Sequence, residues 1–96
     1  MEDPAEHFFN EGVEFGKLGR YPDAPSSFDK AVALKPDYAA AWYNRGNTLR
    51  QLIRYVEALS SYDKAIAINP NHSEAKKNRE IALQKRDKQP RKLTRK

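Results

Sequence analysis

The feature that most constrains this chain is an internal repeat of 34 residues. When residues 5–38 are aligned with residues 39–72, 14 of the 34 pairs are identical, whereas unrelated sequences would give about two. A period of this length is typical of proteins built from small helical units that stack on one another. The identical pairs include Ala5 and Ala39, Asn10 and Asn44, Gly12 and Gly46, Leu18 and Leu52, Tyr21 and Tyr55, Ala24 and Ala58, Ala31 and Ala65, and Pro36 and Pro70.

Each copy of the repeat reads as two antiparallel amphipathic helices, because its apolar residues recur at steps of three and four. Pro36 and Pro70 end the copies, which excludes one long coiled coil, since proline cannot continue a helix. The sequence therefore predicts an all-α fold, an α-solenoid of antiparallel helix pairs. In the first helix of each copy this spacing is seen at Phe8, Phe15 and Leu18 of the first copy and at Trp42, Leu49 and Leu52 of the second. In the second helix it is seen at Ala24, Phe28, Ala31 and Leu34 of the first copy and at Ala58, Tyr62, Ala65 and Ile68 of the second.

Small residues explain how the helices of each pair could meet. Glycine in the first helix and alanine in the second remove bulk where the backbones cross, and aromatic side chains fill the space beside them. The residues predicted to pack within and between the repeats are Phe8, Gly12, Phe15, Ala24, Phe28, Ala31, Trp42, Gly46, Leu49, Ala58, Tyr62 and Ala65.

The pattern also predicts where the helices begin and end. Pro25 is tolerated only in the first turn of a helix, so the second helix should begin near Asp23 or Ala24, later than its counterpart in the second repeat. We expect a lead at 1–4, repeats at 5–38 and 39–72, a capping helix at 73–88 and a flexible basic tail at 89–96. The predicted helices lie near 5–18, 24–34, 39–52, 55–68 and 73–88.

Two stretches carry a resemblance to a known family. The run Ala39-Ala-Ala-Trp-Tyr-Asn-Arg-Gly-Asn, followed by Tyr55-Val-Glu-Ala-Leu and Tyr62-Asp-Lys-Ala-Ile-Ala-Ile-Asn-Pro, resembles the tetratricopeptide repeat, and 5–38 resembles a more diverged copy. The resemblance implies a non-catalytic module that binds other proteins. It also implies that the first helices of successive repeats line a concave groove for an extended peptide or a helix, and that 73–88 closes the array.

Helical spacing then selects the side chains that face such a groove. Asparagine amides can hold a peptide backbone, arginine can bind a carboxylate with two nitrogens, and aromatic side chains can act as buried anchors. Two alternatives stay open: Asn44 and Asn47 are ordinary surface residues, and Phe9 and Tyr43 pack between the repeats. The predicted groove comprises Glu6, Phe9, Asn10, Val13 and Lys17 from the first repeat, Tyr43, Asn44, Asn47, Arg50 and Gln51 from the second, and Lys77, Asn78 and Ile81 from the capping helix.

One activity of the family is not expected from this groove. Some members hold the carboxylate end of chaperone tails with lysines and an arginine on this face. Asn44 fits that scheme, but Phe9, Val13 and Glu74 stand where cationic or amide groups would be needed.

Two positions depart from the family pattern. Glu11 and Arg45 replace an aliphatic residue just before the packing glycine, and because they are equivalent in adjacent repeats we predict a contact between them. Ile53 stands where the first repeat has Gly19, although a β-branched residue disfavours the left-handed geometry that ends a helix there. Either the second turn follows another path, which we favour, or a strained and exposed isoleucine is retained for a partner.

Charge is distributed unevenly along the chain. Residues 1–38 carry a net −4, residues 39–72 +2 and residues 73–96 +7, which sum to the formal +5. This gradient allows an acidic partner, or self-association in which the acidic N-terminal end meets the basic C-terminal end. The tail could also bind nucleic acid or an anionic membrane surface, but it has no aromatic side chain to stack on bases, so nucleic-acid binding is not expected.

Composition argues against catalysis and cofactors. The chain has no cysteine, and its two histidines, His7 and His72, lie 65 residues apart without metal-ligand spacing. Ser26, Ser27, Ser60 and Ser61 recur with the repeat, and we expect them to face solvent or to begin helices. No signal peptide or membrane span is recognised, so we predict a cytoplasmic protein with no enzyme activity, no metal and no cofactor.

Overall fold

The computed structural model describes residues 2–90, and within this range it contains five α-helices and no strand. The predicted all-α fold is confirmed, and each helix boundary lies within one residue of the predicted one. The prediction of a flexible tail falls mainly on residues 91–96, which lie outside the described residues. The helices are α1 (Pro4–Lys17), α2 (Ala24–Leu34), α3 (Ala39–Gln51), α4 (Tyr55–Ile68) and α5 (Ser73–Lys88).

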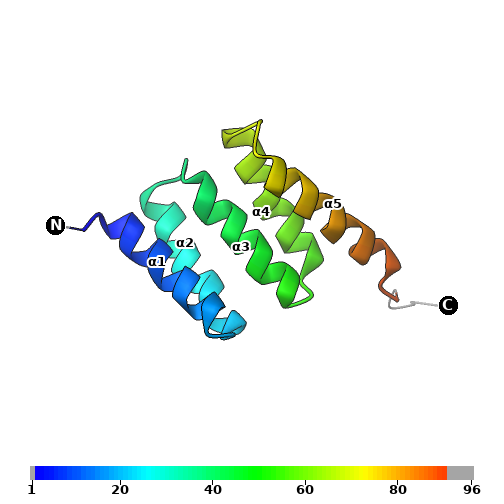
Figure 1. Cartoon of the computed structure of the whole chain (residues 1–96), viewed down its shortest axis with the longest axis horizontal. Coiled ribbons are helices and arrows are strands. Elements are labelled where there is room, and N and C mark those ends of the chain that lie inside the picture. Colours follow the sequence, from blue (N-terminus) through cyan, green and yellow to red (C-terminus); the bar gives the residue numbers. More distant parts are fainter. Residues whose placement is uncertain (1, 91–96) are drawn as a thin grey trace.

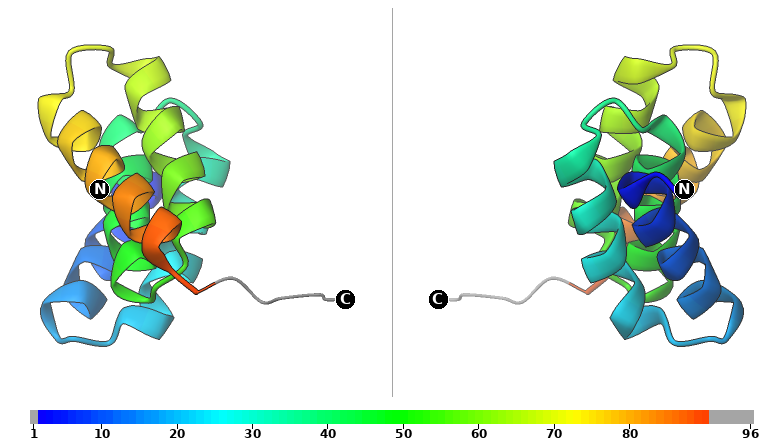
Figure 2. Two further views of the ribbon diagram at one scale, coloured as in Figure 1. Left: turned by 90° about the vertical axis from the view of Figure 1, so that its right-hand side faces the viewer. Right: turned by 90° about the vertical axis from the view of Figure 1, so that its left-hand side faces the viewer.

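The helices form two layers (Figure 1). One layer holds α1, α3 and α5 side by side, and the other holds α2 and α4, as the end-on views also show (Figure 2). Each helix packs against the next one along the chain, and α1 and α5 lie at opposite ends of the row. This order of antiparallel pairs is the predicted solenoid.

Two glycine–aromatic contacts hold the helix pairs together. A Cβ atom placed on Gly12 would lie 2.6 Å from the Phe28 ring, and one on Gly46 would lie 2.7 Å from the Tyr62 ring. Phe28 and Tyr62 are almost completely buried, and the alanines beside them are buried as well. The glycines are therefore required because an aromatic ring from the second helix fills the space that a side chain would occupy.

The start of α2 follows the prediction from its prolines. Tyr21–Asp23 form a short 3₁₀ helix, η1, and α2 begins only at Ala24. In the second repeat α4 already begins at Tyr55, the position equivalent to Tyr21, so α2 starts three positions later than its counterpart. Pro25 lies in the first turn of α2, where its missing N–H breaks no helical hydrogen bond.

The favoured prediction for the turn between α3 and α4 was wrong. Ile53 adopts the left-handed conformation, with φ of 62°, and Gly19 has φ of 74°. Both turns close with the same hydrogen bond, from Arg54 N to Leu49 O at 2.9 Å and from Arg20 N to Phe15 O at 2.8 Å. The second turn thus keeps the path of the first, because these bonds offset the strain on a β-branched residue that is 58% exposed.

The predicted contact between Glu11 and Arg45 was also wrong, because the Glu11 side chain binds α2 and the Arg45 side chain binds α2 and α4. Arg45 Nε donates to Asp29 Oδ1 on α2 at 2.7 Å, and its Nη1 donates to Ser61 Oγ on α4 at 2.6 Å. Glu11 Oε1 accepts from Ser27 Oγ at 2.8 Å.

Two of the four repeated serines are not where the sequence placed them. Ser27 and Ser61 were expected at the surface or at helix starts, but they are buried. Their burial is tolerated because each hydroxyl forms a hydrogen bond with the charged residue that precedes the packing glycine of its own repeat, Glu11 or Arg45.

Candidate functional site

An open hollow of about 370 Å³ lies between α1 and α3, and we call it the α1–α3 groove. The two helices touch only at a few positions, so a gap remains between their facing side chains. The groove is lined by Gly12, Val13, Gly16, Lys17, Tyr21, Phe28, Asn44, Asn47, Thr48, Arg50 and Gln51.

The structure brings together six of the predicted groove residues, namely Val13, Lys17, Asn44, Asn47, Arg50 and Gln51. Three of the others, Phe9, Tyr43 and Asn78, are half-buried in contacts between elements, and Asn10 and Lys77 are exposed outside the groove. Glu6 and Ile81 do not line it either. The groove is therefore shorter than the predicted face, and the capping helix contributes no lining residue.

The charge of the groove is one-sided. Two of its lining residues are cations, Lys17 and Arg50, and none is a carboxylate. The amides of Asn44, Asn47 and Gln51 can each donate and accept hydrogen bonds. Such a surface favours a ligand that presents negative charge together with backbone groups.

A hydrogen-bond network joins one groove residue, Asn47, to α4 and α5. Asn47 Oδ1 accepts from the Tyr62 hydroxyl at 2.6 Å and from Asn78 Nδ2 at 3.0 Å. Asn78 Nδ2 also donates to the Tyr43 hydroxyl at 3.0 Å. Asn47 and Asn78 thus connect α3, α4 and α5, and the carbonyl oxygen of Asn47 is already used inside the protein.

Tyr62 links this network to the cation of the groove. Arg50 Nε donates to the Tyr62 hydroxyl at 3.3 Å, a long hydrogen bond. Burial of the phenol raises the pKa of Tyr62 above its ordinary value of 10.0, and this effect exceeds the opposing effect of Arg50. The hydroxyl therefore stays protonated and donates to Asn47.

The two aromatic residues of the predicted groove pack between elements. The Phe9 ring stacks on Tyr38 with centroids 5.0 Å apart, and it lies 6.0 Å from Phe28. The Tyr43 ring lies 4.6 Å from His72, which accepts a hydrogen bond from Ala75 N at the start of α5. Neither ring lines the groove: the ring contacts of Phe9 lie within the first repeat, and Tyr43 contacts His72 of its own repeat and Asn78 of the capping helix.

Asn44 and Tyr21 show what helical spacing could and could not predict. Asn44 was predicted on the groove and lines it, and its Nδ2 donates to Ala40 O of its own helix at 2.8 Å. Tyr21 lines the groove but was not predicted, because it lies after the first helix, and the groove residues were chosen from the first helices and the capping helix. Its place follows from the late start of α2 at Ala24, which leaves Tyr21 in the turn beside α1.

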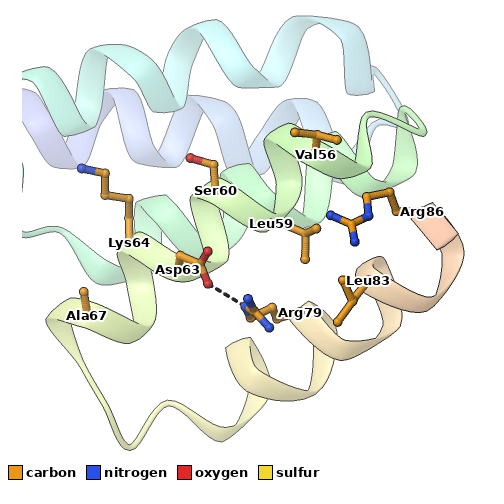
Figure 3. A pocket seen from close by; sticks show the side chains of 9 residues that line it. All are labelled: Val56, Leu59, Ser60, Asp63, Lys64, Ala67, Arg79, Leu83 and Arg86. Atoms are coloured by element: carbon orange, nitrogen blue, oxygen red, sulfur yellow. Dashed lines mark hydrogen bonds and ion pairs between the residues drawn. The ribbon is translucent and has the colours of Figure 1, made fainter.

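A second hollow, of about 430 Å³, lies between α4 and α5, and we call it the α4–α5 hollow (Figure 3). It shares no residue with the α1–α3 groove, and Arg79 Nε donates to Asp63 Oδ1 across it at 2.6 Å. Its lining residues are Val56, Leu59, Ser60, Asp63, Lys64, Ala67, Arg79, Leu83 and Arg86.

Residues 2–90 hold no group of three or more histidine, aspartate or glutamate side chains arranged to bind a metal ion. None of the helices in this part of the chain is long and apolar enough to cross a membrane.

The fold places this chain in the class of α-solenoid repeat proteins. It shows stacked antiparallel helix pairs, close glycine–aromatic contacts between the helices of each pair, and a groove between the first helices. Within that class, the family model described as tetratricopeptide repeat matches residues 9–73, about two thirds of the chain. The chain therefore belongs to the tetratricopeptide repeat family, whose repeats generally mediate protein–protein interaction and are typically non-catalytic. A search of curated proteins found no match.

Proposed function

We propose that the α1–α3 groove binds an extended segment of a partner protein that carries acidic side chains. The observation that carries this proposal is the charge of the lining, which includes Lys17 and Arg50 and no carboxylate. A carboxylate placed between these two cations would form charge-assisted hydrogen bonds, which are stronger than neutral ones.

The remaining lining residues suit a peptide backbone. Asn44 Oδ1 has no partner among the described residues and can accept from a peptide N–H. Gln51 is exposed at the end of α3 and can both donate and accept. Val13 and Tyr21 supply the apolar contact that a bound side chain needs.

A peptide array tests this proposal. Peptides of about twelve residues with acidic, neutral or basic composition are screened, and the affinity of the best binders is measured by fluorescence anisotropy. Acidic peptides should bind most tightly, and Lys17→Ala and Asn44→Ala should each weaken binding about tenfold, as loss of a central contact does. Lys30→Ala, which removes a lysine from α2 in the other layer, is the matched control and should change nothing.

Two outcomes would contradict the proposal: a preference for basic or neutral peptides, and equal loss of affinity in Lys17→Ala and Lys30→Ala. Amidation of the peptide C-terminus should leave affinity unchanged, because the bound charges come from side chains. A large loss on amidation would instead indicate a carboxylate clamp of the kind that the sequence argues against. The cytoplasmic location predicted from the sequence stays a prediction, which cell fractionation would check.

A further inference from the structure

The α4–α5 hollow exposes a surface that is covered elsewhere in the array. Leu83 on α5 corresponds to Leu49 on α3 through the 34-residue period. Leu49 is fully buried because α4 packs over it, whereas Leu83 is only half-buried because the described residues contain no helix after α5. Leu59 of α4 and Leu83 of α5 face one another across the hollow, and Val56 lines its outer edge on α4 (Figure 3).

The rim of this hollow is basic. It carries three cations, Lys64, Arg79 and Arg86, and one carboxylate, Asp63, which Arg79 neutralises. Arg86 also pairs with the neighbouring Asp87 at 3.0 Å, but both side chains are well exposed, so this pair is weak. An acidic surface with an apolar centre would complement the hollow.

Such a surface lies at the opposite end of the same molecule. The outer side of α1 has a hollow of about 330 Å³, the α1 hollow, lined by Glu2, His7, Asn10, Glu11, Glu14, Phe15 and Leu18. It carries three carboxylates and no lysine or arginine. Its apolar centre includes Leu18, which is 61% exposed, and Val56 at the other end of the molecule is 67% exposed.

We propose that the α1 hollow of one copy docks on the α4–α5 hollow of a second copy. Opposite charge aligns the two surfaces, and burial of Leu18 and Val56 supplies the apolar contribution. The contact is heterologous, so each bound copy still presents one free end and can add another copy. The surfaces are small, so the association is weak and transient.

The association is measured on the full chain by sedimentation velocity over a concentration series. At low ionic strength the weight-average mass should rise above the monomer value of 11.1 kDa as concentration increases. High salt should weaken the association about tenfold, because the contact joins exposed charges. A monomer at every concentration in low salt would overturn the proposal.

Two neutral substitutions locate the contact. Leu18→Ser removes an exposed apolar side chain of the α1 hollow and Val56→Ser one of the α4–α5 hollow; because both side chains are exposed, the fold should be retained. Each variant alone should be monomeric, but an equimolar mixture should form a 1:1 dimer that grows no further, because one intact end remains on each. Leu34→Ser removes a comparably exposed leucine outside both hollows, and it should associate like the wild type. Association that persists in both single variants, or a mixture that stays monomeric, would contradict the proposal.

Neither hollow shares a residue with the α1–α3 groove, so the two proposals fail independently.

Discussion

Arg45 of α3 donates from Nε to Asp29 of α2 at 2.7 Å, which joins the second repeat to the first. The same contact recurs 34 residues later, where Arg79 of α5 donates to Asp63 of α4 at 2.6 Å. The period of the chain therefore continues into α5, the helix that follows the two complete helix pairs of residues 2–90. The same pair therefore accompanies the stacking of each unit on the next.

Arg45→Ala should destabilise the protein more than Asp29→Ala. The Asp29 side chain is 56% exposed, so its loss should cost less than about 1 kcal/mol. Loss of Arg45 also leaves the buried Ser61 hydroxyl without its donor, which adds about 1 kcal/mol. Urea unfolding of the two variants measures the difference, and equal losses would show that the contact with Ser61 contributes nothing.

The packing glycines should tolerate no side chain. Gly46→Ala should cost about 1–3 kcal/mol, because the new methyl group would displace the buried Tyr62 ring. Gly16→Ala is the matched control, because nothing lies within 4 Å of its Cβ position, and a helical alanine in place of glycine gains up to about 1 kcal/mol. Thermal or urea unfolding of both variants should give opposite signs, and equal signs would contradict the packing account.

Ile53→Gly should stabilise the protein. The left-handed conformation costs a β-branched residue about 1–2 kcal/mol, and glycine removes this cost but loses more entropy on folding. We expect a net gain of about 0.5–1 kcal/mol. Gly19→Ile should lose a similar amount, because it introduces the strain at the equivalent turn. A destabilised Ile53→Gly variant would show that the isoleucine side chain makes a contact that stabilises the fold by more than the left-handed conformation costs.

Stability should fall when the pH rises above about 10. The pKa of Tyr62 is raised in the folded state, so the folded protein keeps the phenolic proton at pH values where the unfolded chain loses it. The contribution of Tyr62 is therefore fully present below its unfolded pKa and is lost as the pH rises through the folded pKa. Urea unfolding at pH 8 to 11 should show a smaller decline for Tyr62→Phe, although that variant also loses its hydrogen bond to Asn47. The same decline in both proteins would contradict this assignment.

The sequence predicted the helices well because their determinants are local. Periodic apolar residues and the prolines at 25, 36 and 70 define the helix boundaries without reference to the tertiary structure. The turn at Ile53 was mispredicted because intrinsic preference favoured another path. Backbone hydrogen bonds to α3 and the packing of α4 instead impose the geometry that Gly19 shows in the first repeat.

The candidate site was predicted only in part, since spacing identifies a helix face but not the direction of long side chains. Arg45 was predicted to contact Glu11 on α1, but its guanidinium instead donates to α2 and to α4. Asn47 was predicted on the groove, but its oxygen also serves Tyr62 and Asn78, residues that are distant in the sequence.

The most direct test of the central proposal is a titration of ¹⁵N-labelled protein with the tightest acidic peptide, followed by two-dimensional NMR. The side-chain amide signals of Asn44 and Gln51 should shift together with the backbone signals of Lys17 and Arg50, while those of Asn69 and Asn71, outside the groove, stay unchanged. Shifts centred on Val56 and Leu83, or no shifts at saturating peptide, would contradict the assignment of the α1–α3 groove as the binding site.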